Sequence, residues 1–259
     1  MLATQKLDSI TGRSTRFEPV PRGQLPPALP PETRPVGQLV AEAVRLYGNF
    51  FWSVLPLGLP IAIVNQVSVG HRLWVQVAVL AAAAPVLSAA YVGACLRIRR
   101  GPWAIPFVLG TLLILPVPLL MLVYVLPAVA WLALFGLAVP AGVFERLGFG
   151  AALRRGLDLG RADYVHALGS LAALTIIFGV TKLALIVLLH GQADAAERTA
   201  LFLGDLVLSP MLFLGAALLY FDQAARVKSG PRTRRTRDGD LHTSFKPDGA
   251  GRSDAEVES

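Results

Sequence analysis

A long stretch without charge, residues 101–144, constrains this chain more than any other feature. These 44 residues contain no Asp, Glu, Lys, Arg or His. As a single helix they would be roughly 66 Å long at about 1.5 Å per residue, about twice the ~30 Å hydrocarbon core of a bilayer. The stretch therefore predicts two consecutive membrane crossings.

The composition of the whole chain agrees with a membrane protein. Of the 259 residues, 54% are apolar and only 16% are charged, whereas soluble domains have about 45–50% and 25%. The single cysteine, Cys95, makes no internal disulfide. The N-terminus has no apolar segment typical of a cleaved signal peptide, so we expect the first span to direct targeting. The net charge of +7 comes from tails and short loops beside spans, which favours membrane lipids and not nucleic acid as the partner.

Apolar segments predict an all-α bundle of six transmembrane helices. The uncharged stretch could be divided at Pro116 or at Pro127, and a division at Pro116 leaves a third span too short for the bilayer. We therefore place the division at Pro127 and expect Pro116 to kink the third span. The predicted spans are residues 51–69, 73–96, 103–125, 128–144, 165–189 and 200–221.

Two further segments are amphipathic, and both tails are polar. Residues 36–50 and 145–164 combine apolar and polar faces at helical spacing, which predicts two interfacial helices on the cytoplasmic side. Residues 1–35 are rich in proline, and residues 228–259 are basic and then acidic. We expect both tails to be disordered on either side of a membrane domain at 36–227.

The distribution of basic residues predicts the topology. The second-to-third and fourth-to-fifth loops carry seven Lys and Arg residues, whereas the loops on the other side carry Arg72 and Arg198. By the positive-inside rule both termini lie in the cytoplasm.

Three blocks of sequence resemble a family of bacterial integral membrane proteins. The blocks are GQLVAEAVRLYGNFF at 37–51; Leu126-Pro127 with LAVPAGVFE at 137–145 and ALRRGLDL at 152–159; and LLYFDQAAR at 218–226. They are similar to the membrane domain attached to some glycerophosphodiester phosphodiesterases. Gly156 stands where that family usually has serine. The resemblance implies a helical membrane module often of unknown role, and no phosphodiesterase activity, because the soluble catalytic barrel is missing.

No residue set for catalysis, metal binding or a cofactor can be recognised in the sequence. The four histidines are scattered without ligand spacing. The chain has no GxSxG, P-loop or HExxH motif. We therefore expect no catalytic residues, no metal and no cofactor.

Two charges inside predicted spans are the strongest candidates for a site. Lys182 in the fifth span and Asp205 in the sixth lie at depths that differ by only ~3 Å on consecutive antiparallel helices. A charge in hydrocarbon costs about 2.5–3.5 kcal/mol on insertion scales, so we expect the two to form an ion pair. Its role, structural or as a proton or substrate site, stays open. Asn65, Gln66 and Gln76 are at similar depth and could line a polar cavity with it.

At the cytoplasmic side the sequence predicts a lock made of ion pairs. Glu145 and Asp222 end two spans close to basic residues, and pairs between them would dock the second interfacial helix under the bundle. The predicted members are Glu145, Arg154, Arg155, Asp222 and Arg226. Beyond the last span, we expect Arg232, Arg234, Arg235 and Arg237 to bind anionic lipid headgroups.

The sequence thus predicts a non-catalytic, multi-pass protein of the bacterial inner membrane that acts as an envelope scaffold or partner-binding module. The alternative is a small transporter or lipid-handling protein that uses the polar cluster in the outer half of the bundle. A transporter needs a polar path past the midplane, whereas the polar residues of a scaffold stay in one leaflet.

Overall fold

The computed structural model describes the backbone of residues 34–244 and the side chains up to residue 228. Within this range the chain is helical and has no strand, which confirms the all-α class. The helices are α1 (Val36–Asn49), α2 (Phe51–Val54), the 3₁₀ helix η2 (Leu55–Gly58), α3 (Leu59–Ser68), α4 (Leu73–Ala82), α5 (Ala84–Ile98), α6 (Ala104–Ile114), α7 (Val117–Val123), α8 (Val125–Phe135), α9 (Ala138–Phe144), α10 (Phe149–Ala162), α11 (Tyr164–Leu188) and α12 (Asp194–Ser244).

Five segments are long and apolar enough to cross a membrane, and a bent pair of helices gives a sixth if the pair is one span. The five are Phe51–Ser68, Ala104–Val123, Val125–Phe144, Tyr164–Leu188 and Asp194–Lys228. The bent pair is α4 with α5, which meet at an angle of 48°. Each predicted span corresponds to one of these segments, so the chain is a multi-pass membrane protein.

Proline explains why most spans are broken while α11 is continuous. Proline lacks a backbone N–H and its ring clashes with the carbonyl of residue i−4, so it kinks helices. Pro116 separates α6 from α7 inside the third span, as expected. The turn to the fourth span falls at Tyr124, whose backbone is extended (φ −168°, ψ 161°), just before Pro127. The division near Pro127 is therefore right, and Pro127 itself lies in the first turn of α8.

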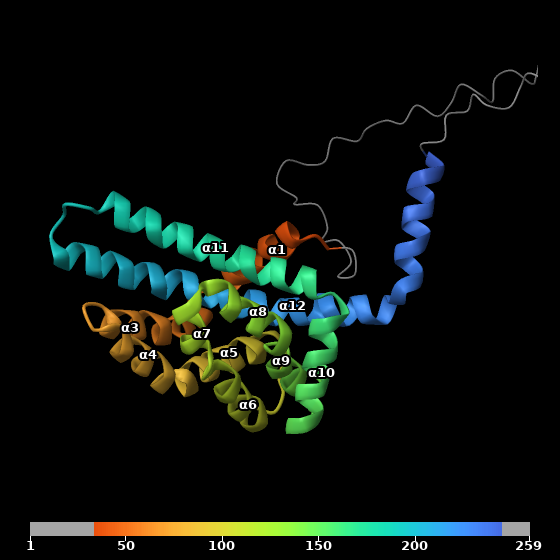
Figure 1. The fold of residues 1–259 in the computed structure, drawn as a ribbon, viewed down its shortest axis with the longest axis horizontal. Coiled ribbons are helices and arrows are strands. Elements are labelled where there is room, and N and C mark those ends of the chain that lie inside the picture. The colour runs from red at the N-terminus through yellow and green to blue at the C-terminus, as the bar shows by residue number, and fades with distance from the viewer. Residues whose placement is uncertain (1–33, 245–259) are drawn as a thin grey trace, which may run out of the picture.

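The last helix is longer than predicted. The sequence predicts a sixth span at 200–221, whereas the backbone of α12 continues to Ser244, and its last part turns away from the bundle (Figure 1). Arginine is a favourable helix residue, and a proline such as Pro231 bends a helix without necessarily ending it. The predicted boundary at residue 228 therefore falls inside α12. The rest of the predicted tails, residues 1–33 and 245–259, lies outside the described residues.

Both predicted amphipathic helices form, as α1 and α10. The apolar face of α1 buries Leu39 and Ala43 completely, and the helix packs against α11 and α12. In α10 the buried face consists of three small residues and Leu159, and the helix packs against α8 and α9. A Cβ atom at Gly156 would lie 2.4 Å from the backbone nitrogen of Ala138. Glycine at this position therefore lets α10 approach the backbone of α9 closely.

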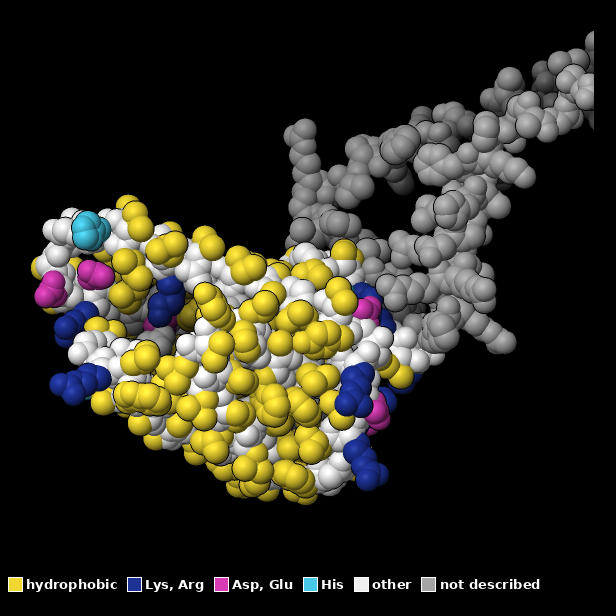
Figure 2. All heavy atoms as spheres, in the orientation of Figure 1, with side chains coloured by type: hydrophobic (Ala, Val, Ile, Leu, Met, Phe, Trp, Pro, Cys, Tyr) yellow, Lys and Arg dark blue, Asp and Glu magenta, His cyan; other side chains and the backbone are white. Residues whose placement is uncertain are grey.

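Helix α12 is the central element of the bundle. It packs against α1, α3, α5, α10 and α11, and with α11 it forms a long hairpin (Figure 1). Figure 2 shows hydrophobic side chains as a broad band over the middle of the visible face, with charged side chains at its two ends. An apolar band of this kind suits contact with lipid chains. Trp74 lies just after the α3–α4 turn and Tyr124 lies in the α7–α8 turn. Trp52 lies at the start of α2, and Trp103 follows the basic residues that end α5. All four rings are exposed.

Candidate functional site

Buried polar side chains are concentrated on α12. In the described part of the chain, the buried polar residues are Ser88, Ser170, Asp205, Ser209, Asp222 and Gln223. Four of the six belong to α12. Asp205 and Asp222 are 17 positions apart, roughly 26 Å along a helix, which is close to the hydrocarbon thickness of a bilayer. The candidate site therefore has two parts, one toward each end of the membrane-spanning portion of α12.

The first part, the Asp205 cluster, consists of Asn65, Lys182, Asp205 and Ser209. Lys182 Nζ lies 2.9 Å from Asp205 Oδ1 and 3.1 Å from Oδ2. Asn65 Nδ2 donates to Asp205 Oδ2 at 2.8 Å. The structure thus brings together the two charges that the sequence pairs, and it adds an amide donor from α3. The Asp205 side chain is 2% exposed and that of Lys182 is 24% exposed, so the carboxylate is enclosed while the ammonium group reaches the edge of the bundle.

Backbone geometry around Pro210 places these side chains together. Pro210 has no N–H, so the carbonyl of Leu206, four residues earlier, loses its usual helical partner. Gly58 lies against that carbonyl, and a Cβ atom there would be 2.1 Å from the Leu206 oxygen. Ser209 Oγ also donates to Gly58 O at 3.4 Å. This close approach holds the start of α3 on α12 and carries Asn65 to Asp205.

Two of the three amides predicted to line a polar cavity with the ion pair do not reach it. Gln66 is exposed. Gln76 donates to the backbone carbonyl of His71 at 2.9 Å and so closes the turn before α4. Only Asn65 of the three amides contacts the ion pair. Depth along a helix was estimated correctly, but the rotation of each helix about its axis directs Gln66 and Gln76 elsewhere.

The second part, the Asp222 network, consists of Arg34, Glu145, Arg155, Asp163, Tyr220, Asp222, Gln223 and Arg226. In it, Arg155 Nε donates to Glu145 Oε1 at 2.9 Å. The Tyr220 hydroxyl donates to the same oxygen. Burial opposes the ionisation of Glu145, but these two hydrogen bonds and the charge of Arg155 outweigh it and lower the pKa of the carboxyl group below 4.5. Glu145 thereby ties α10 to both α9 and α12, as the predicted lock requires.

The other predicted members of the lock have different partners from those expected. Asp222 pairs with Arg34, whose Nη1 lies 3.1 Å from Oδ1. Arg226 pairs with Asp163 at 3.0 Å and donates to the backbone carbonyl of Arg34 at 2.7 Å. Asp222 therefore holds the segment before α1 and not α10. Arg154 is exposed and lies outside the network.

Sequence reasoning missed Arg34, Asp163, Tyr220 and Gln223. Asp163 had a detectable signal, since an Asp directly before a long apolar run is a typical helix N-cap. Its side chain accepts from His166 N at 3.3 Å at the start of α11, and Gln223 donates to its carbonyl at 3.2 Å. Arg34 had no signal, because it falls in a proline-rich segment without periodicity. The side chains of Arg232, Arg234, Arg235 and Arg237 lie outside the described part, so their predicted lipid contacts stay a prediction.

The arrangement does not provide a metal centre. Among the described side chains, no three His, Cys, Asp or Glu residues come close enough to hold a metal ion. Every carboxylate that is buried in this part of the chain has a basic partner.

An apolar layer separates the Asp205 cluster from the Asp222 network. Between them, α12 buries Met211, Leu214, Ala217 and Leu219, and Leu214 packs with Val54 and Ala94 from other helices. Fold and site together define an all-α, multi-pass membrane protein with paired charges toward both ends of the membrane-spanning part of its central helix. Comparison with family models, with curated proteins and with solved structures finds no match.

Proposed function

We propose that this chain is a non-catalytic module of the bacterial inner membrane that serves as an envelope scaffold and binds a membrane partner. The observation that supports this most is the apolar layer between the two charged clusters. A transporter needs polar groups that continue past the midplane, whereas here Leu214, midway along α12 between Asp205 and Asp222, is completely buried among apolar side chains. The ion pairs at both ends then stabilise the bundle and are not steps of a permeation path.

The resemblance to the phosphodiesterase-associated membrane domain is part of this proposal. The first block lies mainly in α1 and the second in α8 to α10. The third lies in α12, where the membrane-spanning part of that helix ends. Contacts between these helices bring the blocks to the same end of the bundle, where Glu145, Asp222 and Arg226 form the Asp222 network. This convergence supports a shared structural role for the blocks.

The proposed orientation places the Asp222 network and both termini in the cytoplasm. The seven basic loop residues that support it belong to the α5–α6 connection and to the segment from α9 to α11. The four arginines between positions 232 and 237 would then face anionic headgroups, at about 1 kcal/mol each near the surface.

Helix α11 offers the best surface for a partner within the membrane. Only Ala167, Ser170 and Leu174 of its 25 residues are buried, and Val165, Val180 and Val187 are at least 60% exposed. A photo-reactive amino acid at Val180 in intact cells should give a discrete protein adduct, and the same amino acid at the buried position Ala167 should not. Adducts to lipid alone at Val180 would contradict the scaffold proposal.

The alternative is a small transporter, and the partial exposure of Lys182 beside a buried carboxylate is the observation in its favour. Proteoliposomes of the full chain with an entrapped pH dye distinguish the two functions. We expect no proton flux above protein-free vesicles. Flux that disappears in K182M would favour the transporter.

A further inference from the structure

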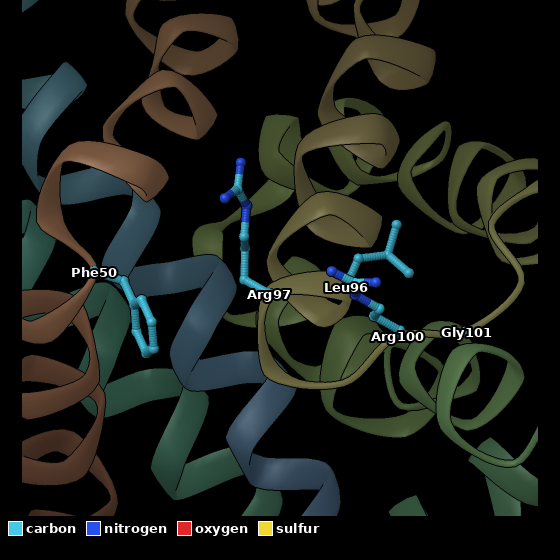
Figure 3. A pocket seen from close by; sticks show the side chains of 5 residues that line it. All are labelled: Phe50, Leu96, Arg97, Arg100 and Gly101. Carbon is cyan, nitrogen blue, oxygen red and sulfur yellow. The ribbon is translucent and has the colours of Figure 1, made fainter.

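A cavity between two corners of the chain forms a basic site that none of the preceding functions uses. It has a volume of about 530 Å³ and is lined by Phe50, Leu96, Arg97, Arg100 and Gly101. Figure 3 shows Phe50 on one side, where α1 gives way to α2, and the other four residues at the end of α5 and just beyond it. The Arg97 side chain extends into the space between the two chain segments (Figure 3).

The backbone explains why the two corners stay apart. Phe50 leaves the helical region (φ −117°, ψ 20°) and so interrupts the path from α1 to α2. Arg99 is extended (φ −151°, ψ 130°) and ends α5. Beyond it, a Cβ atom at Gly101 would lie 2.1 Å from the carbonyl oxygen of Val143. Contact with α9 therefore holds the chain after α5, and the space in front of Phe50 is left open.

The two arginines of the cavity differ from those of the Asp222 network. Arg34, Arg155 and Arg226 each have a carboxylate within 3.1 Å. Among the described residues, neither Arg97 nor Arg100 has an acidic side chain within ion-pair distance. A guanidinium group matches the geometry of a phosphate and can bind it through two parallel hydrogen bonds. Two uncompensated guanidinium groups beside an apolar wall therefore favour a ligand that carries a phosphate on an apolar body.

Exposed tryptophans indicate the depth of the cavity in the membrane. Trp52 is 81% exposed and Trp103 is 64% exposed. They lie two residues from Phe50 and from Gly101, respectively, along the chain. Exposed tryptophan is enriched at the membrane–water interface, where headgroup phosphates lie. The cavity is therefore at the level of lipid phosphates.

We propose that this cavity binds the phosphate of an anionic phospholipid, with Arg97 and Arg100 at the phosphate and with Phe50 and Leu96 along the upper part of an acyl chain. The inference does not depend on the scaffold role. A free phosphate ester has the same headgroup chemistry without the chain, and the test separates these two sources.

Native mass spectrometry of the full chain in detergent, titrated with phosphatidylglycerol, tests the proposal. The R97Q/R100Q variant should bind the lipid about tenfold more weakly or worse, because each cation near the surface contributes to headgroup affinity. The R72Q/R198Q variant removes two arginines at the opposite end of the bundle and should bind as the unchanged protein does. Equal affinities of the two variants would overturn the site. Equally strong binding of phosphatidylcholine, which carries the same phosphate but no net charge, would refute the assignment to an anionic phospholipid.

Two additional measurements keep the result interpretable. R97K/R100K retains the positive charge but loses the bidentate guanidinium geometry, so its affinity should lie between those of R97Q/R100Q and the unchanged protein. F50A should weaken lipid binding while leaving both arginines in place. Full affinity in F50A would refute the contact of Phe50 with the acyl chain. Affinity of R97K/R100K equal to that of the unchanged protein would refute the bidentate recognition of the phosphate by arginine. Glycerol phosphate added in excess should leave the lipid bound. Displacement by glycerol phosphate would mean that the phosphate alone is recognised, which retains the phosphate site but refutes the acyl-chain contact.

Discussion

Replacing Lys182 with methionine should destabilise the bundle strongly, because it leaves the Asp205 carboxylate enclosed without a counter-charge. The two charges are 2.9 Å apart, so their gross attraction is about 6 kcal/mol at an effective dielectric constant of about 20. Desolvation offsets part of this attraction, and removing one partner of a buried pair costs about 3–5 kcal/mol. We expect K182M to fall in that range.

The opposite replacement should cost less, because the two partners are not equally buried. In the unchanged protein the Lys182 side chain is already 24% exposed. In D205L it can therefore extend its ammonium group toward water. We expect about 1–3 kcal/mol for D205L, which mainly reflects the lost hydrogen bonds. The double variant K182M/D205L leaves no charge enclosed and should be less destabilised than K182M alone.

The chain contains its own reporter for this measurement. Its single cysteine, Cys95, is completely buried, so a thiol-reactive dye labels only protein that has opened. Equilibrium unfolding in mixed detergent micelles, followed by this labelling, gives the free energy of unfolding of each variant. Losses for K182M and D205L that simply add in the double variant would refute the coupling between the two residues.

Three more predictions follow from the same structure. G156A should lose about 1–3 kcal/mol, because its Cβ would lie 2.4 Å from the Ala138 nitrogen, whereas G150A on the same helix has open space and should be neutral in the same labelling assay. The lowered pKa of Glu145 means that its contribution to stability is full above pH 4.5 and disappears as the pH falls through the lowered value; the difference in Tm between E145Q and the unchanged protein should therefore be present at pH 7 and vanish in acid, and a constant difference would contradict this. A cysteine at Ser229 in a cysteine-free background should resist an impermeant reagent in intact cells, and labelling from outside would reverse the proposed topology.

The local pattern of apolar and charged residues was sufficient to predict the helices of the bundle. The uncharged stretch at 101–144 required two crossings, because helix length and bilayer thickness are both set by geometry that does not depend on neighbours. The same rise per residue placed Lys182 and Asp205 at one depth, and the cost of an isolated charge in hydrocarbon required a partner. The two amphipathic helices followed from periodicity alone.

Tertiary structure decided everything that depends on the rotation of helices and on contacts between distant segments. Hydropathy cannot tell which way Gln66 and Gln76 point, and it does not predict that Asp222 meets Arg34, since these residues are far apart in sequence and their pairing depends on how α12 packs beside the start of α1. The sequence likewise does not show that glycine is required at positions 58 and 156, because the requirement comes from the close approach of another helix's backbone. The basic cavity lies between the α1–α2 junction at Phe50 and the end of α5. Its existence depends on how these two segments are placed in space, which the sequence pattern of neither segment determines.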